Sequence, residues 1–238
     1  MSSPRVLVLR AAGVNCEVET VHAWELAGAS AQVVHINALR ENPRQLLDYQ
    51  ILTIPGGFSY GDDVSAGKIL ANQMEVFLGD QLRAFAERDR LILGICNGFQ
   101  ILTEAGFLPG VLMRNAGLKF VCRPVKLVIE ESRSAFTRNY AAGEVVSFPV
   151  ANGDGNYFAD DETLERLEGE GRVAFRYAPG DNPNGSRNGI AGILNEKRNV
   201  LGLMPHPERV CESMPGSTGR TGGTDGRVLF QSLIDTLS

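Results

Sequence analysis

The sequence contains few of the residues on which several protein classes depend. Its 238 residues include 4 Cys, 3 His and 1 Trp, and the formal net charge is −5 at pH 7. The four cysteines (Cys16, Cys96, Cys122 and Cys211) form no C-x-x-C pair, which argues against a zinc ribbon and against a compact disulfide framework. The small acidic excess gives no general attraction to nucleic acid or to anionic lipid.

Long apolar runs and nucleotide-binding loops are also missing. The longest strongly apolar stretches, residues 91–96 and 199–204, fall far short of the ~18 residues that a membrane helix needs. No G-x-x-x-x-G-K-[ST] loop occurs, and no cluster of His and carboxylates has the spacing of a metal site. We therefore expect a cytoplasmic chain with reduced cysteines, no metal, and neither nucleic acid nor membrane as a partner.

In the first hundred residues, short apolar runs alternate with stretches of helical spacing. Strands are predicted at residues 5–9, 31–36, 51–54 and 91–95, and helices at 15–28, 68–87 and 98–105. In the first helix, Asn15 is the expected cap, Val18, Val21 and Leu26 fall at helical spacing, and Gly28 ends the helix. The alternation predicts βαβ units, hence an α/β fold with helices on both faces of a parallel sheet.

The second half of the chain is richer in predicted strands. Extended segments are predicted at residues 119–129, 144–150, 172–177, 190–194 and 199–204, and a final helix at 227–237. The acidic stretch 154–170 is typical of a solvated helix face and loop, and residues 213–226 of turns. No repeat and no composition break marks a linker, so we expect one domain over residues 1–238. Ligands of such sheets bind at the carboxyl ends of strands.

The clearest chemical signal is the segment Gly94-Ile95-Cys96-Asn97-Gly98, between a predicted strand and a predicted helix. This is the context of a nucleophile elbow, G-x-S-x-G, with cysteine in place of serine. Gly94 and Gly98 lack the β-carbons that would collide where strand and helix cross. The helix N-terminus favours a thiolate at Cys96, and the amide of Asn97 would face an oxyanion. The alternative for Cys96 is an ordinary buried core cysteine.

The segment Pro205-His206-Pro207-Glu208 follows another predicted strand and favours the catalytic interpretation. Proline on both sides holds the backbone of His206 extended, and residues two apart on an extended chain project to the same side. The imidazole and the carboxylate can therefore form a hydrogen bond. Together with Cys96, His206 and Glu208 form a candidate Cys–His–acid triad.

A third strand end carries the glycine-rich segment Pro55-Gly56-Gly57. Paired glycines allow backbone amides to point into a cleft without obstruction from side chains. The glycines that follow do not have G-x-G-x-x-G spacing and do not open the helix after the first strand, so a dinucleotide site is not indicated.

These motifs together resemble those of the class I (triad) glutamine amidotransferases. Within that family, residues 55–62, 96–102, 118–124 and 204–209 look like the glutaminase subunits of phosphoribosylformylglycinamidine synthase, which acts in purine biosynthesis. The similarity covers nearly the whole chain. It implies a three-layer sandwich with a mostly parallel central sheet, the flavodoxin-like fold of the family.

The resemblance implies hydrolysis of L-glutamine through a γ-glutamyl thioester on Cys96, with His206 as base and Glu208 orienting it. It also implies oxyanion amides from Gly57 and Asn97 and a substrate-binding role for Gln100. Ammonia would pass to a large synthase subunit, and a small bridging subunit is a further implied partner. ATP and Mg²⁺ would bind only to the synthase subunit, so no cofactor is expected in this chain.

Two alternatives remain open at this point. A cysteine hydrolase of the intracellular protease or deglycase type would share the elbow, and a non-catalytic docking subunit could retain the residues of an inactive site. The sequence also departs from the family in places. Residues 152–155 read Asn-Gly-Asp-Gly where the family usually shows His-Gly-Glu-Gly.

Overall fold

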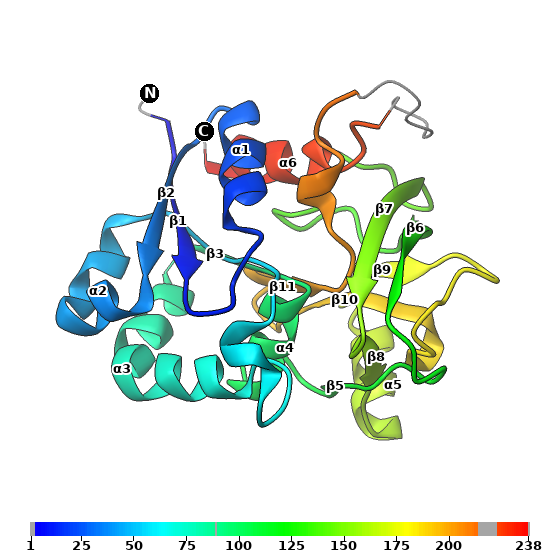
Figure 1. Ribbon diagram of the computed structural model, residues 1–238. Helices are drawn as coiled ribbons and strands as arrows, with labels where there is room; N and C mark the ends of the chain where they lie inside the picture. Colours follow the sequence, from blue (N-terminus) through cyan, green and yellow to red (C-terminus); the bar gives the residue numbers. More distant parts are fainter. Residues whose placement is uncertain (1–2, 89, 214–222, 238) are drawn as a thin grey trace.

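Strands and helices alternate through the first hundred residues of the chain, as the apolar pattern predicts. Figure 1 shows this in a computed structural model, which describes residues 3–88, 90–213 and 223–237. The elements are β1 (Arg5–Arg10), α1 (Glu17–Leu26), β2 (Ser30–His35), α2 (Ile36–Glu41), β3 (Ile51–Ile54), α3 (Lys68–Glu87), β4 (Leu91–Ile95) and α4 (Asn97–Glu104), with short 3₁₀ turns η1 (Pro43–Asp48) and η2 (Ser59–Asp62).

The second half of the chain supplies most of the remaining strands. They are β5 (Val111–Met113), β6 (Val121–Ile129), β7 (Val145–Asn152), β8 (Asn156–Phe158), β9 (Val173–Tyr177), β10 (Ile190–Leu194) and β11 (Val200–Leu203). Helices α5 (Asp161–Gly169) and α6 (Arg227–Leu237) and the turns η3 (Arg187–Gly189) and η4 (Pro207–Arg209) complete the elements of the described residues.

Both halves contribute to one large sheet. Nine strands of the described residues pair in the order β2-β1-β3-β4-β11-β10-β9-β6-β7. The first five in this order run parallel, and from β11 onward neighbouring strands are antiparallel. Strands β5 and β8 pair separately. The predicted fold class is confirmed, and the structure adds an antiparallel half built from the strand-rich second part of the sequence.

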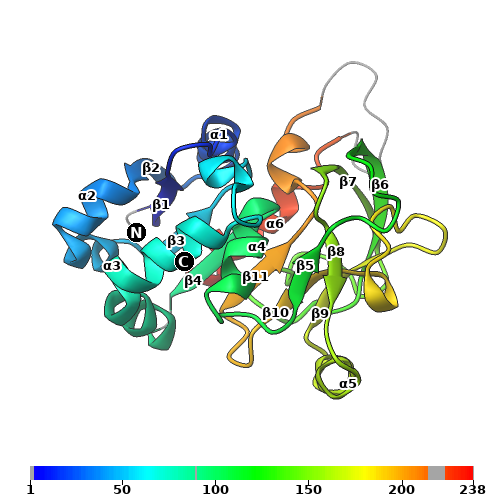
Figure 2. The same ribbon diagram turned by 60° about the horizontal axis from the view of Figure 1, so that its bottom comes forward.

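Helices cover both faces of the parallel half, which makes three layers. Helices α1 and α6 lie on one face, and α3 and α4 lie on the other (Figures 1 and 2). Strands β3 and β4 bury every residue, as a parallel strand covered on both faces must. Among the described residues, none of the helices combines the length and the apolar content needed to cross a membrane.

Helix α1 differs in detail from its prediction. Its N-cap is Cys16 rather than Asn15, and no side chain caps the free amides there. Val18 is 74% exposed, whereas Trp24 is fully buried. The ring of Trp24 meets Phe230 of α6 edge-on, with the ring centroids 4.8 Å apart. The packing of Trp24, the largest side chain of the helix, against α6 therefore determines which face of α1 is buried. The spacing of the small apolar residues does not determine it.

The acidic stretch 154–170 is a solvated helix over part of its length, as predicted. Helix α5 buries Leu164 and Leu167, and the Asp160 carboxylate caps it by accepting a hydrogen bond from the Thr163 amide at 2.8 Å. The three-residue strands β5 and β8 and the short helix α2 were not predicted, because each is too short to show a period. Most of the turns predicted at residues 213–226 lie outside the described residues.

The pairing register brings three strand ends to one edge of the sheet. Ile54 of β3 pairs with Gly94 of β4, and Gly94 in turn pairs with Gly202 of β11. The segments that follow these three strands therefore leave the sheet side by side. They are the glycine-rich loop, the cysteine elbow and the Pro-His-Pro-Glu segment.

The crossing of β4 and α4 depends on Gly98. A β-carbon there would lie 1.9 Å from the carbonyl oxygen of Ile54, a backbone atom of β3 that cannot turn aside. We expect Gly98→Ala to lower the free energy of unfolding by about 2 kcal/mol or more, because overpacking a filled interior forces the backbone to shift. Urea unfolding followed by circular dichroism measures this change.

Gly169 provides the matched control. It is the last residue of α5, and a β-carbon there would meet nothing within 4 Å. Gly169→Ala should leave stability unchanged or raise it by up to about 1 kcal/mol, since alanine favours helix. Equal stability of the two variants would contradict the proposed close approach at Gly98.

Candidate active site

Cys96 occupies a strained turn between β4 and α4. Its backbone has φ 52° and ψ −105°, a conformation that L-residues rarely adopt. The Cys96 amide donates a hydrogen bond to the Leu203 carbonyl at 2.8 Å, which ties the turn to β11. A β-carbon on Gly94 would lie 2.7 Å from the Gly98 carbonyl oxygen, so only glycine permits this turn. The predicted nucleophile elbow is therefore present.

His206 and Glu208 form a buried pair next to this elbow, as the sequence predicts. The His206 Nδ1 atom and the Glu208 Oε1 atom are 2.6 Å apart, and both side chains are almost fully buried. The His206 amide donates to the Pro149 carbonyl of β7 at 2.8 Å, which fixes the backbone of the loop. The other ring nitrogen, Nε2, has no hydrogen-bond partner among the described residues and is free to take a proton from a nucleophile.

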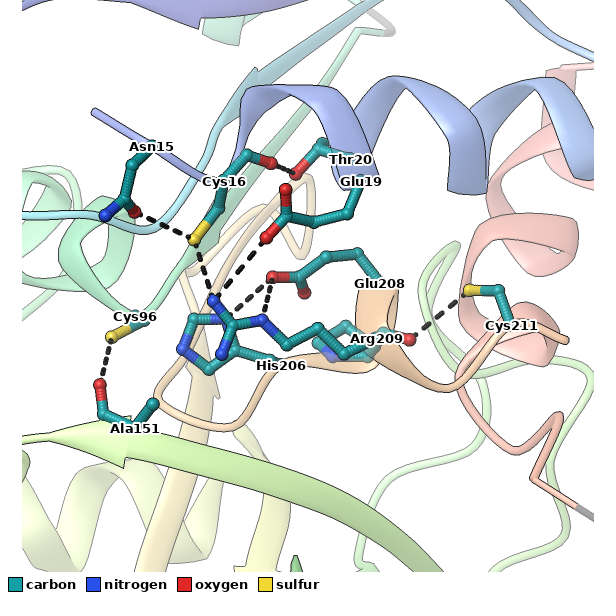
Figure 3. Close-up of polar contacts among 11 residues, drawn as sticks. Asn15, Cys16, Glu19, Thr20, Cys96, Ala151, His206, Glu208, Arg209 and Cys211 are labelled. Carbon is teal, nitrogen blue, oxygen red and sulfur yellow. Dashed lines mark hydrogen bonds and ion pairs between the residues drawn. The ribbon is translucent and has the colours of Figure 1, made fainter. Parts of the chain in front are cut away.

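Gly56 marks the closeness of the thiol and the imidazole. A β-carbon on Gly56 would lie 2.8 Å from His206 Cε1 and 3.5 Å from Cys96 Cβ. The bare glycine therefore lets the loop after β3 pack closely against both catalytic candidates. The Cys96 Sγ atom also lies 4.0 Å from the Ala151 carbonyl oxygen of β7 (Figure 3).

The surroundings of His206 favour its charged form. Burial opposes the imidazolium, but the Glu208 carboxylate and the neighbouring thiol Cys96 outweigh it, and the pKa of His206 is raised well above its ordinary 6.5. Such a shift is expected of a base that must hold a proton next to a thiolate. The Glu208 carboxylate also fixes the ring, because Nδ1–H must donate to it and Nε2 is then directed to the reacting side.

The predicted oxyanion and substrate residues lie around the elbow. Gly57 has φ +143°, and the backbone bonds on either side of it use the amides of Cys16 and Phe58. Asn97 begins α4, and its side-chain amide donates to Gln100 Oε1 at 2.8 Å. The structure therefore brings Gly57, Asn97 and Gln100 to the same edge of the sheet as Cys96.

Gln100 connects α4 to the segment that departs from the family pattern. Its Nε2 atom donates to the Asp154 carbonyl oxygen at 2.6 Å. Within the same segment, the buried Asn152 amide donates to Asn115 at 3.1 Å and to Asn184 at 3.0 Å. Asn152 therefore stabilises the loop through its hydrogen bonds to Asn115 and Asn184. The backbone of Asp154 contacts the site through Gln100.

Two residues of the site were missed by sequence reasoning. Cys16, at the start of α1, is buried with its sulfur beside the imidazole, and Arg209 follows Glu208 in η4. The Arg209 Nη2 atom donates to Cys16 Sγ at 3.2 Å (Figure 3). Burial raises the pKa of the Cys16 thiol, which therefore favours the neutral form. Arg209 could have been noticed beside Glu208, whereas nothing in the sequence places residue 16 next to residue 206.

Cys16 also changes the expectation about metal-ligand clusters. Cys16, His206 and Glu208 each offer one ligand atom, and these atoms lie within 4.8 Å of one another. The sequence shows no such cluster, because Cys16 lies 190 residues before His206. The atoms are already used, since His206 Nδ1 faces Glu208 and the guanidinium of Arg209 donates to Cys16 Sγ. A cation on that sulfur would meet the positive charge of Arg209. The absence of a metal stays a prediction.

Comparisons with known proteins agree with this geometry. The model of the CobB/CobQ-like glutamine amidotransferase domain matches residues 3–234. This chain belongs to that family. The resemblance inferred from the motifs is therefore confirmed.

Relatives in the glutamine amidotransferase family are similar over nearly the whole chain. A Rhizobium meliloti (strain 1021) protein, phosphoribosylformylglycinamidine synthase subunit PurQ, is 51% identical over 231 residues, which is 97% of this chain and 98% of that protein. The Brucella abortus protein of the same name is 56% identical over 187 residues, 79% of this chain and 80% of the relative. A chain in the structure of PurLQS from Thermotoga maritima is 39% identical, with a TM-score of 0.84 and full coverage of both chains.

The pairing of His206 with Glu208 can be tested by Glu208→Gln. Removal of the carboxylate charge should lower the pKa of His206 by about one unit or more. The folded-state pKa is raised, so the pair's stabilisation is full below pH 6.5 and is lost as the pH rises through the folded-state value. In the variant, this dependence of unfolding free energy on pH should flatten. Imidazole NMR titration and urea unfolding at several pH values measure both effects.

Glu212→Gln is the control for this experiment. Glu212 pairs with His22 at 3.0 Å, but both side chains are more than half exposed. An exposed pair contributes little to stability, so this variant should leave the titration of His206 unchanged. A His206 pKa that is the same in wild type and in Glu208→Gln would contradict the role assigned to the carboxylate.

Proposed function

We propose that this chain is the glutaminase subunit of phosphoribosylformylglycinamidine synthase. It hydrolyses L-glutamine and supplies ammonia to an ATP-dependent synthase subunit, which converts formylglycinamide ribonucleotide to formylglycinamidine ribonucleotide. The observation that carries the proposal is the position of Cys96, on a strained backbone turn, beside the buried His206–Glu208 pair. Similarity to relatives named as this subunit over nearly their whole length supports the choice of substrate.

The reaction begins at the Cys96 sulfur. The thiol gives its proton to His206 Nε2, and the sulfur attacks the side-chain amide carbon of glutamine. The tetrahedral intermediate collapses when the imidazolium returns the proton to the leaving nitrogen, which departs as ammonia. The enzyme then holds a γ-glutamyl thioester. His206 next takes a proton from water, the hydroxyl adds to the thioester carbon, and glutamate leaves as the proton returns to Cys96.

Backbone amides would stabilise the oxyanion of both steps. Asn97 lies in the first turn of α4, where a helix leaves its N–H groups without intrahelical acceptors. Gly57 lies opposite Val14 in an isolated antiparallel bridge. The backbone hydrogen bonds beside it run from the Cys16 amide to the Gly56 carbonyl and from the Phe58 amide to the Gly13 carbonyl, so neither uses the Gly57 amide. Two fixed donors beside the sulfur stabilise charge that develops only in the transition state.

Gln100 is proposed to hold the substrate glutamine. Its side chain is 5% exposed and is fixed by Asn97 at one end and by the Asp154 carbonyl at the other. Gln100 therefore joins α4 to the 152–155 loop beside Cys96. Its side-chain amide, fixed by these two hydrogen bonds, is proposed to contact the substrate.

The partners follow from the proposed reaction. Ammonia must be used by a separate large synthase subunit, and ATP and Mg²⁺ would bind there, with no cofactor in this chain. The relative from Thermotoga maritima comes from the structure of PurLQS, which supports a complex with the large subunit and with a small bridging subunit. Strands from both halves in one sheet support a single domain over residues 1–238. A cytoplasmic location remains part of the proposal.

The two alternatives explain less. A hydrolase of the intracellular protease or deglycase type shares the elbow, but it does not account for similarity to synthase subunits along nearly the whole chain. A docking subunit without activity would not need the 2.6 Å contact between His206 and Glu208 or the strained backbone of Cys96.

Cys96→Ala in the assembled synthase tests the proposal. Glutamine-dependent amidine formation should fall by roughly a thousandfold or more, because the proposed thioester forms on the Cys96 sulfur. Amidine formation from added ammonium chloride should be unchanged, since the synthase reaction does not need the thiol. Both rates are measured in the same complex.

Cys122→Ser is the matched control, because Cys122 is an exposed thiol on β6, opposite Ala151 of β7, and has no role in the proposed reaction. It should keep both activities. Undiminished glutamine-dependent turnover by Cys96→Ala would overturn the proposal. Turnover of peptides or glycated amines in place of glutamine by the wild type would support the protease or deglycase alternative.

A further inference from the structure

Arg209 connects the catalytic pair to helix α1. It is the last residue of η4, directly after Glu208, and its side chain is about one-third exposed. Its Nη2 atom lies 3.2 Å from Cys16 Sγ and 3.5 Å from Glu19 Oε1, and its Nε atom lies 4.0 Å from Glu208 Oε1 (Figure 3). One guanidinium therefore contacts two residues at the start of α1 and the carboxylate that orients His206.

The α1 end of this connection is rigid. The Cys16 amide donates to the Gly56 carbonyl at 3.3 Å, and the Cys16 carbonyl accepts from the Thr20 hydroxyl at 2.6 Å. Cys16 is therefore fixed both to the glycine loop of the site and to the first turn of the helix. The hydrogen bond from Arg209 to Cys16 therefore anchors the guanidinium to a fixed residue near Glu208.

We propose that Arg209 is a positioning residue for the glutaminase reaction: anchored by Cys16 and Glu19, it holds the Glu208 carboxylate directed at His206 Nδ1 and adds a positive charge beside the pair. The inference rests on the proposed function. Arg209 does not touch the reacting atoms. It acts through the orientation of Glu208 and through the field of its own charge.

The charges around Glu208 give the reason. Among the described residues, the ion pairs of Glu208 are those with His206 and Arg209, and its second oxygen, Oε2, is buried without a hydrogen-bond partner. A buried carboxylate needs nearby positive charge to offset the cost of its desolvation. When His206 is neutral, as the catalytic cycle requires in some steps, Arg209 is the cation that remains.

The other titratable groups near the pair do not supply this charge. Cys96 and Cys16 face His206, and Cys211 lies near Glu208 with its sulfur 3.3 Å from the Pro207 carbonyl oxygen. Burial raises the pKa of Cys16 and of Cys211, so both favour neutral thiols. Glu19 is negative and is paired with Arg209 itself.

The inference has a consequence of definite sign for pH dependence. The active form of the Cys96–His206 pair carries one proton fewer than the inactive form that exists at low pH. A positive charge nearby favours the loss of that proton, so removal of the Arg209 charge should make the proton harder to lose. The acidic limb of the pH–rate profile should therefore move to higher pH.

The experiment compares three variants in the assembled synthase. Arg209→Gln removes the charge, and Arg209→Lys keeps it. The control Arg10→Gln breaks a matched ion pair with helix α1, in which Arg10 of β1 lies 3.5 Å from Glu17. We expect Arg209→Gln to shift the acidic limb of kcat/KM for glutamine upward by about half to one pH unit. It should lower kcat roughly tenfold at neutral pH while KM stays within about twofold. Arg209→Lys and Arg10→Gln should retain the wild-type limb.

An ordinary surface ion pair would give a different result. In that case Arg209→Gln would lower the melting temperature or kcat but leave the acidic limb in place, and the proposal would be overturned. It would also be overturned if Arg209→Lys shifted the limb as far as Arg209→Gln. Imidazole NMR of His206 provides a readout that needs no activity, and Arg209→Gln should raise its pKa.

The two readouts separate this inference from the proposed function. If the wild-type complex does not hydrolyse glutamine, the proposed function fails, but the NMR titration still tests the coupling of Arg209 to His206. If glutamine is hydrolysed and neither the limb nor the His206 titration moves, only the role of Arg209 fails.

Discussion

The site depends on the parallel pairing of β3, β4 and β11 in one register. Backbone hydrogen bonds fix the register of these strands, so that their carboxyl ends lie side by side. The bond from the Cys96 amide to the Leu203 carbonyl continues the pairing past the end of β4. The glycine loop, the thiol and the imidazole leave the sheet from adjacent strands because of it. A shift of one residue in any of the three would turn side chains to the opposite face and separate the thiol from its base.

Close packing at this edge is possible only because β-carbons are missing at a few points. Gly98 lets α4 lie against the Ile54 carbonyl, and Gly56 lets the loop after β3 pack closely against His206 and Cys96. Glycine at these positions serves close contact rather than flexibility. The strained backbone of Cys96 is tolerated because the strand before it and the helix after it are both firmly packed.

Electrostatics then determine what the assembled residues can do. A buried carboxylate fixes one nitrogen of His206 and raises the pKa of the ring, which leaves the other nitrogen toward the thiol. The carboxylate itself lies between the imidazole and the guanidinium of Arg209, whose position is set by the start of α1. The candidate catalytic pair is therefore connected, through Arg209, to a helix that contributes none of the candidate triad residues.

The sequence by itself determined the α/β class and the order of most elements, and it pointed to the three candidate triad residues. Those inferences depend on local signals: apolar runs that must be buried, glycines around a cysteine, and prolines that hold His206 and Glu208 on one side of an extended chain. Tertiary structure alone decided the face that α1 buries, where Trp24 meets Phe230, and the antiparallel half of the sheet. It also decided the place of Cys16 beside His206, because their approach across some 190 residues comes from strand order and packing, which no local pattern encodes.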